Sequence, residues 1–335
     1  MIDSLFEKFK SLKVLVVGDV MIDAYLTGGV SRISPEAPVP IVEIRKRSYR
    51  IGGAANVAMN IRALGAEPIL CSVVGRDDKG SLLAGLMKEN GLSQEGICLS
   101  DKRKTTIKYR IIGNKAQMLR IDDEDTAELS VDEQSELLAR IGKIIGEGNV
   151  DAVVFEDYDK GVLSKTVIDG IMEMAKKHDI IVTVDPKKRN FNNYSGADLF
   201  KPNLKELQEG LDNRSEVLSL DEIERLMREF AETMHVSKMM TTLSERGIAV
   251  YDLEKHLFFS QPAFLRRISD VSGAGDTVIS VATLCLAAGL PADKMAVISN
   301  LAGGIVCEFA GVVPIEAEVL KSHVRKELDG SIIFE

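Results

Sequence analysis

The run Asp270-Val-Ser-Gly-Ala-Gly-Asp-Thr277 places small residues and a carboxylate directly before an apolar helical pattern. Gly273–Gly275 would expose backbone N–H groups with little side-chain bulk at the start of that helix. The first amides of a helix have no intrahelical partner, and the helix dipole favours negative charge there. Such a turn suits a phosphoryl group in transit, and Asp276 would stand where it could take a proton from an incoming hydroxyl. A glycine-rich turn with an ordinary helix cap fits the same residues.

Composition and motif spacing exclude several other classes of protein. The motif is neither Gly-x-Gly-x-x-Gly after a first strand nor Gly-x4-Gly-Lys-Ser/Thr, which disfavours a Rossmann dehydrogenase and a P-loop NTPase. The 335 residues carry a net charge of −9 with both signs interspersed, whereas a nucleic-acid binder would normally concentrate basic residues on one face. The four cysteines form no CxxC pair or zinc-type cluster. Small anionic substrates stay open, because a few local cations can hold a phosphate on an acidic protein.

Short apolar runs rich in β-branched residues alternate with helical patterns along most of the chain. Such runs suit strands buried on both faces, so the alternation predicts an α/β domain with a mostly parallel sheet. The predicted strands are Val14–Val17, Ile69–Val74, Ala152–Phe155, Ile180–Val184 and Lys238–Thr242. The predicted helices are Ala54–Leu64, Lys79–Asn90, Asp132–Ile145, Lys165–Lys177 and Leu220–Met234.

Two regions interrupt this alternation. Residues 28–51 have the pattern of short extended pieces with three prolines, and residues 105–121 contain two strand-like runs around Gly113-Asn114, which indicates a hairpin. We therefore expect one domain over residues 1–335 with a discontinuous β lid, formed by about residues 24–51 and 104–122. The N-terminus has no apolar run typical of a secretory signal, and no apolar stretch reaches the roughly 20 residues that span a bilayer. A soluble, cytoplasmic protein without a membrane partner is expected.

The motif at 270–276 resembles the C-terminal signature of the ribokinase-like, or PfkB, carbohydrate kinases. Gly52-Gly-Ala-Ala-Asn-Val-Ala58 resembles the N-terminal signature of that family, and the two together are far more specific than either alone. Further similar runs are Gly75-Arg-Asp-Asp78, Asp185-Pro-Lys187, Lys201-Pro-Asn-Leu-Lys-Glu206 and Asn300-Leu-Ala-Gly303. The resemblance covers about residues 10–320. It implies the ribokinase-like three-layer α/β/α sandwich, with ATP as phosphoryl donor and Mg²⁺ as its metal.

The resemblance also implies which residues act. Asp276, ionised at pH 7, would be the catalytic base, and positioning and charge stabilisation would supply most of the catalysis. The implied anion hole consists of Gly273, Ala274 and Gly275. In the implied sugar site, Asp19 follows the first strand, where ligands gather in parallel sheets, and Asp23 assists it with sugar hydroxyls. The remaining sugar contacts are Gly52, Gly53 and Asn56. Asp23 fits a solvated loop carboxylate, and Asn56 a helix cap.

The implied nucleotide site lies in the second half of the chain. Asn203 and Glu206 match an Asn-x-x-Glu pattern linked to magnesium and phosphate, so Glu206 is predicted to act on Mg²⁺ through water. A loop usually written Thr-x-Gly-x-x-Gly corresponds to residues 242–247, with Ser244 in place of the first glycine, which leaves its backbone shape open. The implied contacts are Thr242, Ser244, Gly247, Asn300 near the adenine, Lys187 at a phosphate, and Gly273 and Gly275. Lys187 fits a solvated turn equally well.

One subgroup of the family resembles this chain in further runs. Gly18–Asp23, Ser31–Pro40, Asn114–Asp122 and Glu156–Gly161 are similar to the kinase domain of heptose-phosphate kinase/adenylyltransferases. Those enzymes phosphorylate D-glycero-D-manno-heptose 7-phosphate at the anomeric hydroxyl, and Asp157 would contact this substrate. Its phosphate needs cations, for which arginine is well suited. The predicted cations are Arg32, Lys108, Arg110 and Arg120, each of which alone also fits a solvated surface charge.

The resemblance also bears on the partners of the chain and on alternative functions. The sequence holds no Gly-x-Phe-Asp-x-x-His-x-Gly-His run of the nucleotidyltransferase, so the kinase step alone is expected of this chain. A homodimer through the β lid is expected by analogy. A requirement for a monovalent cation such as K⁺ stays open, as do the product anomer and the pathway. The alternatives are a kinase for another sugar, sugar phosphate or nucleoside, and a catalytically silent sugar-binding regulator.

Overall fold

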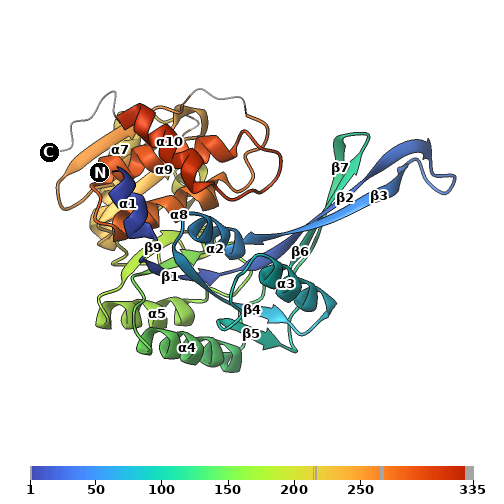
Figure 1. Ribbon diagram of the computed structural model, residues 1–335, viewed down its shortest axis with the longest axis horizontal. Coiled ribbons are helices and arrows are strands. Elements are labelled where there is room, and N and C mark those ends of the chain that lie inside the picture. Colours follow the sequence, from blue (N-terminus) through green and yellow to red (C-terminus); the bar gives the residue numbers. More distant parts are fainter. Residues whose placement is uncertain (1, 214, 216, 265–267, 329–335) are drawn as a thin grey trace.

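A nine-stranded sheet forms the centre of the computed structural model, which describes residues 2–213, 215, 217–264 and 268–328 (Figure 1). Its strand order is β13-β12-β11-β10-β9-β8-β1-β4-β5. The strands from β11 to β5 in this order are parallel, and β12 runs antiparallel to both of its neighbours. The strands are β1 (Lys13–Gly18), β4 (Glu67–Gly75), β5 (Ile97–Ser100), β8 (Ala152–Glu156), β9 (Ile181–Asp185), β10 (Leu199–Phe200), β11 (Lys238–Thr242), β12 (Ile248–Asp252) and β13 (Leu257–Gln261).

Helices cover both faces of this sheet. Along β1, Val14 and Val16 enter one buried apolar cluster, whereas Leu15 and Val17 enter a second, because successive strand side chains point to opposite faces. The helices that pack on the first cluster are α1 (Ile2–Phe9), α2 (Ala54–Ala63), α3 (Asp78–Glu89), α8 (Ala274–Ala287), α9 (Ala292–Val306) and α10 (Ala317–Leu328). Those on the second are α4 (Val131–Gly146), α5 (Lys165–Lys177), α6 (Leu204–Gly210) and α7 (Leu220–Met234). The predicted three-layer α/β/α sandwich is confirmed.

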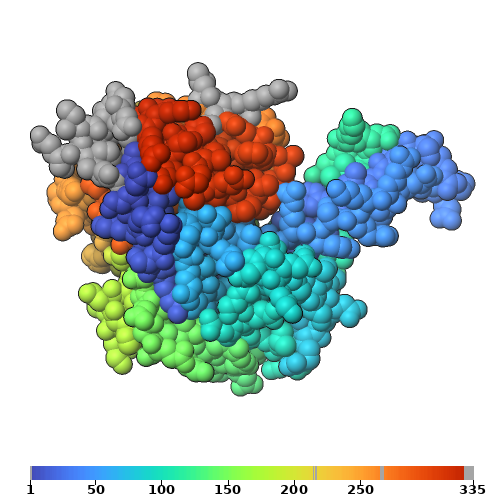
Figure 2. Space-filling model, viewed as in Figure 1, coloured from blue at the N-terminus to red at the C-terminus, as the bar shows by residue number. Residues whose placement is uncertain are grey.

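A second sheet of four strands, here called the small sheet, stands out from the body as an arm (Figures 1 and 2). It consists, in the order β3-β2-β6-β7, of β3 (Pro40–Gly53), β2 (Val20–Ile33), β6 (Ile107–Gly113) and β7 (Ala116–Asp123). The turn between β6 and β7 places Asn114 and Lys115 at φ 51° and 69°, the left-handed pair of a two-residue hairpin turn. These strands occupy the two stretches of chain from which the β lid was expected.

The two faces of the small sheet differ in chemistry. Arg110 lies beside Tyr25 on one side and opposite Arg120 on the other, so these three side chains share a face that carries cations. The alternate positions carry Leu119 and Ile121, which are 57% and 47% exposed. The small sheet therefore has a cationic face and an apolar face.

Candidate active site

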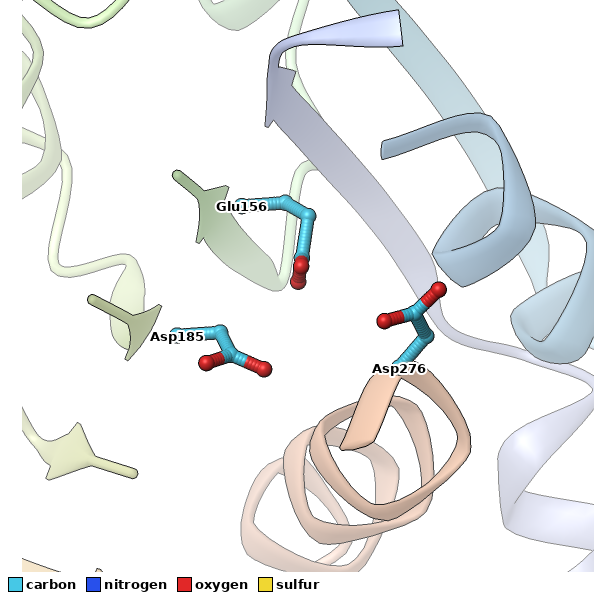
Figure 3. A group of neighbouring side chains, drawn as sticks. All are labelled: Glu156, Asp185 and Asp276. Carbon is cyan, nitrogen blue, oxygen red and sulfur yellow. The ribbon is translucent and has the colours of Figure 1, made fainter. Parts of the chain in front are cut away.

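The carboxyl ends of the central parallel strands meet the N-terminus of α8. Glu156 ends β8 and Asp185 ends β9, while Asp276 lies in the first turn of α8. Figure 3 shows these three carboxylates pointing toward one another from the three elements. Asp19 directly follows β1 and Lys201 directly follows β10, at the same edge of the sheet. Open α/β sheets bind ligands at this edge.

The turn before α8 has the geometry expected of an anion hole. Gly273 is the N-cap of α8 with φ 80°, a left-handed conformation that glycine adopts at little cost. A Cβ atom there would lie 2.8 Å from Asn56 Nδ2, so a side chain would displace that amide. Ala274 begins the helix, but its amide donates to the Val271 carbonyl at 3.3 Å, so the predicted anion-hole role of this amide is not supported. A Cβ on Gly275 would lie 3.7 Å from Lys201 Nζ. The predicted residues thus bring helix-start amides next to a buried ammonium group.

Asp276 is held at both carboxylate oxygens. Asn56 Nδ2 donates to Oδ2 at 2.7 Å, and the Tyr158 hydroxyl donates to Oδ1 at 2.9 Å. The side chain is buried, and burial raises its pKa above the usual aspartate value, while the hydrogen bond from Asn56 lowers it and the charge of Asp185 raises it. Burial also raises the pKa of Tyr158, so its hydroxyl stays protonated as a donor. The two donors aim the carboxylate and favour its charged form.

Glu156, Asp185 and Asp276 form a cluster that fits a divalent cation. One oxygen from each lies within 4.8 Å of the other two, and all three residues are buried. Glu156 Oε2 has no hydrogen-bond partner among the described residues, whereas Lys201 pairs with Asp185 at 2.7 Å. Burial, then the charges of Asp185 and Asp276, raise the pKa of Glu156 well above its usual value. Carboxylate oxygens are the donors that Mg²⁺ prefers, and Glu156 and Asp185 would hold it here.

Asp19 and Asp157 bind backbone and neighbouring side chains. Asp19 accepts from the amides of Tyr158 and Lys160 at Oδ2 and from that of Val162 at Oδ1, each at 3.0 Å. Asp157 accepts from the side-chain amide of Asn190 and from the Tyr194 hydroxyl, both at 2.9 Å. Burial, followed by the charge of Asp19, raises the pKa of Asp157 to about 6. Both carboxylates therefore fix the loop that carries Tyr158, and their contact with a sugar stays a prediction.

Gly52 and Gly53 allow β3 to pass close to β2. A Cβ on Gly52 would lie 2.6 Å from Asp23 Oδ2, and one on Gly53 would lie 2.3 Å from the Asp19 carbonyl oxygen. Gly53 also has φ 63°. A larger residue at position 53 would meet the chain backbone at Asp19 and push the two strands apart, whereas one at position 52 would displace the Asp23 carboxylate. Close packing therefore requires both glycines whether or not a sugar also approaches them.

The four predicted cations of the small sheet separate into two pairs. Arg110 forms a largely buried ion pair with Asp23, and Lys108 Nζ lies 5.8 Å from the centre of the Tyr158 ring. Burial, then Lys160, lowers the pKa of Lys108. Arg120 pairs with Asp122 on the outer strand at 2.9 Å, and Arg32 is exposed toward the far end of β2. The structure thus brings Lys108 and Arg110 toward the site but not Arg32 and Arg120.

On the nucleotide side, Asn203 and Glu206 cap α6 reciprocally. The Glu206 amide donates to Asn203 Oδ1 and the Asn203 amide to Glu206 Oε2, both at 2.8 Å. The other Glu206 oxygen pairs with Lys187, whose Nζ lies 5.4 Å from the Tyr158 ring centre. Burial lowers the pKa of Lys187, but the carboxylates of Asp185 and Glu206 outweigh it and raise the value. The predicted action of Glu206 on Mg²⁺ through water stays a prediction.

The loop after β11 keeps a glycine-like backbone despite its serine. Thr242 forms an isolated parallel bridge with Asn203, which joins this loop to α6. Ser244 has φ 54° and Gly247 has φ 93°, both in the left-handed region that favours glycine. The Asn300 side chain donates to the Pro262 carbonyl at 2.9 Å. Ser244 thus adopts the backbone shape that a glycine would, and the predicted nucleotide contacts stay predictions.

Four residues of this site were not among the predicted site residues: Glu156, Tyr158, Asp185 and Lys201. All four lie in runs that the family resemblance had already marked. For Glu156, Asp185 and Lys201, the position at a strand end was a usable signal, since neighbouring parallel strands end at one edge. Tyr158 carries no such signal, because its contact with Asp276 joins residues 118 positions apart in the chain.

This fold and this carboxylate at a helix N-terminus define a class of phosphotransferases that act on a hydroxyl group. The profile described as pfkB family carbohydrate kinase matches residues 11–317. The chain belongs to the pfkB carbohydrate kinases and is an ATP-dependent sugar kinase of that family.

Curated relatives carry a more specific name. The chain is 38% identical over 319 residues to "Bifunctional protein HldE" of Methylobacillus flagellatus, which covers 94% of this chain and 63% of that protein. It is 39% identical to the protein of the same name from Desulfatibacillum aliphaticivorans, over 95% of this chain and 64% of that protein. The chain therefore spans somewhat less than two thirds of the length of these relatives.

Solved structures share the fold at low sequence identity. Phosphofructokinase-2 from Escherichia coli in complex with potassium superposes with a TM-score of 0.76 at 18% identity, covering 95% of this chain and 99% of that one. Arabidopsis thaliana ribokinase complexed with ribose and ATP gives 0.71 at 16% identity, covering 96% and 99%. Among the described helices, none is both long and apolar enough to cross a membrane.

The acidic cluster predicts that Mg²⁺ binding releases protons. The raised pKa of Glu156 lets this carboxyl hold its proton to higher pH than a free glutamate would, and a metal ligand must lose its proton. Titration with Mg²⁺ alone, by calorimetry in two buffers of different ionisation enthalpy, should show this release. Glu156→Gln should abolish it and weaken binding by at least about tenfold.

Glu124→Gln is the matched control for this titration. Glu124 also carries a buried oxygen without a hydrogen-bond partner among the described residues, but it pairs with Lys160 outside the cluster. Equal Mg²⁺ affinity and proton release in wild type and Glu156→Gln would contradict the assignment of Glu156.

Proposed function

We propose that the chain transfers a phosphoryl group from Mg-ATP to the anomeric hydroxyl of D-glycero-D-manno-heptose 7-phosphate, giving the 1,7-bisphosphate. The observation that carries the proposal is the buried Asp276 carboxylate, aimed by Asn56 and Tyr158 at the N-terminus of α8. The name shared by the curated relatives and the cations on the small sheet support the heptose phosphate as acceptor.

Each step of the transfer has a group to perform it. Asp276 accepts the proton of the sugar hydroxyl as that oxygen attacks phosphorus. The amides of Gly273 and Gly275 and the Lys201 ammonium stabilise the charge on the transferred group. Mg²⁺, when bound, neutralises phosphate charge, and Glu156 and Asp185 would hold it, with Glu206 acting through water. Lys187, two residues after the end of β9, would contact the phosphates of ATP.

The substrate phosphate would bind to the cationic face of the small sheet. Lys108 lies beside the ring of Tyr158, the tyrosine that donates to Asp276. Arg110 lies two residues further along β6, about 6.8 Å away on an extended strand. A sugar whose reacting hydroxyl lies at Asp276 would extend its other end in this direction. Arg110 already holds the Asp23 carboxylate, so a phosphate would compete with or bridge to an existing ion pair.

A homodimer through the small sheet completes the proposal. The apolar face of the small sheet carries Ile44, Leu119 and Ile121, each more than 40% exposed. A second copy of this face would remove these side chains from water. Sedimentation velocity should give a dimer for the wild type and a monomer for Leu119→Asp, which places a charge on the apolar face. A monomeric wild type at micromolar concentration would contradict the dimer.

Replacing the base should abolish turnover and spare nucleotide binding. Asp276→Asn keeps the size of the side chain and removes its ability to accept a proton, so kcat should fall by about 10²- to 10⁴-fold. Circular dichroism should show an unchanged fold, and calorimetry should show ATP affinity within a few-fold of wild type. A variant with nearly wild-type kcat would overturn the role of Asp276 as base.

A panel of acceptors tests the heptose assignment. ADP release should favour glycero-manno-heptose 7-phosphate over sedoheptulose 7-phosphate, fructose 6-phosphate, fructose, ribose and adenosine by more than tenfold in kcat/KM, about 1.4 kcal/mol. Arg110→Met should raise KM for the heptose phosphate by tenfold or more and barely change kcat/KM for unphosphorylated heptose. A preference for an unphosphorylated sugar or a nucleoside would contradict the heptose phosphate as acceptor but would leave the assignment as a kinase unchanged.

A further inference from the structure

The segment 310–312 packs directly against the residues that form the anion hole. A Cβ on Gly273 would lie 3.3 Å from Val312 Cγ1, so the Val312 side chain borders the N-cap of α8. The Asp270 carboxylate joins the two segments, accepting from the Ser272 amide at Oδ1 and from the Gly311 amide at Oδ2, both at 2.9 Å. The backbone that enters the anion hole is therefore held by the segment 310–312.

This segment is itself held by a residue of the small sheet. Arg50 Nη1, on β3, donates to the carbonyl of Val312 at 2.8 Å and to that of Ala310 at 3.4 Å. A Cβ on Gly311 would lie only 2.6 Å from Arg50 Nη1, and Gly311 has φ 72°. Glycine thus permits both the turn and the close approach of the guanidinium group. The contact joins residues about 260 positions apart in the chain.

Arg50 also belongs to the face of the small sheet that would receive the substrate phosphate. Its guanidinium carbon lies 5.5 Å from the centre of the Tyr25 ring, and that of Arg110 lies 5.3 Å from the same ring. Both cations are attracted to the ring face. One tyrosine therefore contacts the cation proposed for the substrate and the cation that holds the segment 310–312.

We propose that Arg50 is a positioning residue for phosphoryl transfer: it fixes the segment 310–312 and, through Asp270 and Val312, the amides of Gly273 and Gly275. The role in transfer rests on the proposed kinase function. Donors aimed at a developing charge act only when they are held in place beforehand, and a displacement of about 1 Å can cost up to 10²-fold in rate. The anion hole is thus completed from the small sheet, although none of its own residues comes from there.

The kinetic test compares three substitutions in β3. Arg50→Met should lower kcat by about 10- to 100-fold and leave KM for ATP and sugar within about threefold. Arg50→Lys should recover part of kcat, since an ammonium group can reach one carbonyl but lacks the guanidinium fork. Arg47→Met is the control, because Arg47 is exposed on the opposite face of β3 and should keep wild-type kinetics.

Hydrogen–deuterium exchange tests the same contact without turnover. In Arg50→Met, peptides covering 269–275 and 307–315 should exchange at least about fivefold faster than in wild type and Arg47→Met, because a local opening then costs less free energy. Unchanged exchange would overturn the inference even if the chain is a heptose kinase. Faster exchange with an unchanged kcat would limit Arg50 to stabilising the segment and overturn its role in transfer.

The two experiments also separate this inference from the proposed function. A wild type that phosphorylates no sugar would discard the kinase assignment and the transfer role of Arg50 together. The exchange result would then decide alone whether Arg50 holds the segment 310–312.

Discussion

The site is built around one buried carboxylate, Asp276, that lies among other acids. Burial disfavours its ionised form, and Asp185 nearby does the same. Two donors oppose this: Asn56 from α2 and Tyr158 from the loop after β8. Three elements far apart in the chain must therefore meet at one side chain. The central sheet makes this possible, because its parallel strands β1, β8 and β9 all end at the same edge, which faces the N-terminus of α8.

The other charges around Asp276 are balanced in a similar way. Lys201 neutralises Asp185, Lys187 pairs with Glu206, and Arg110 pairs with Asp23. Glu156 stands out, since one of its oxygens has no hydrogen-bond partner in the described part of the chain. The site thus holds paired cations that a phosphate could take over and a carboxyl that a metal ion could use. In the absence of a ligand, such paired groups cost less free energy to bury than isolated charges would.

Much of the body could be predicted from sequence, because each central strand is a short β-branched run and each predicted helix has regular apolar spacing. The lid cations could not be placed, since only the strand register shows that Arg110 faces Asp23 whereas Arg120 pairs with Asp122 on the outer strand. The loop-anchoring bonds of Asp19 were also hidden, because its partners lie about 140 residues away. The local sequence pattern indicates which residues form a helix or strand, but it does not indicate which helices and strands contact one another.

The connection between β1 and β2 has a mechanical consequence. Only Asp19 separates the central strand from the small sheet, and its backbone bonds Glu156 on one side and Ala54 on the other. Asp19 therefore ties β2 both to the central sheet and to the start of α2, so a displacement of β2 relative to β1 would strain these two bonds. Its carboxylate meanwhile holds the amide of Tyr158. One residue thus couples the junction of the two sheets to the loop whose tyrosine contacts Asp276.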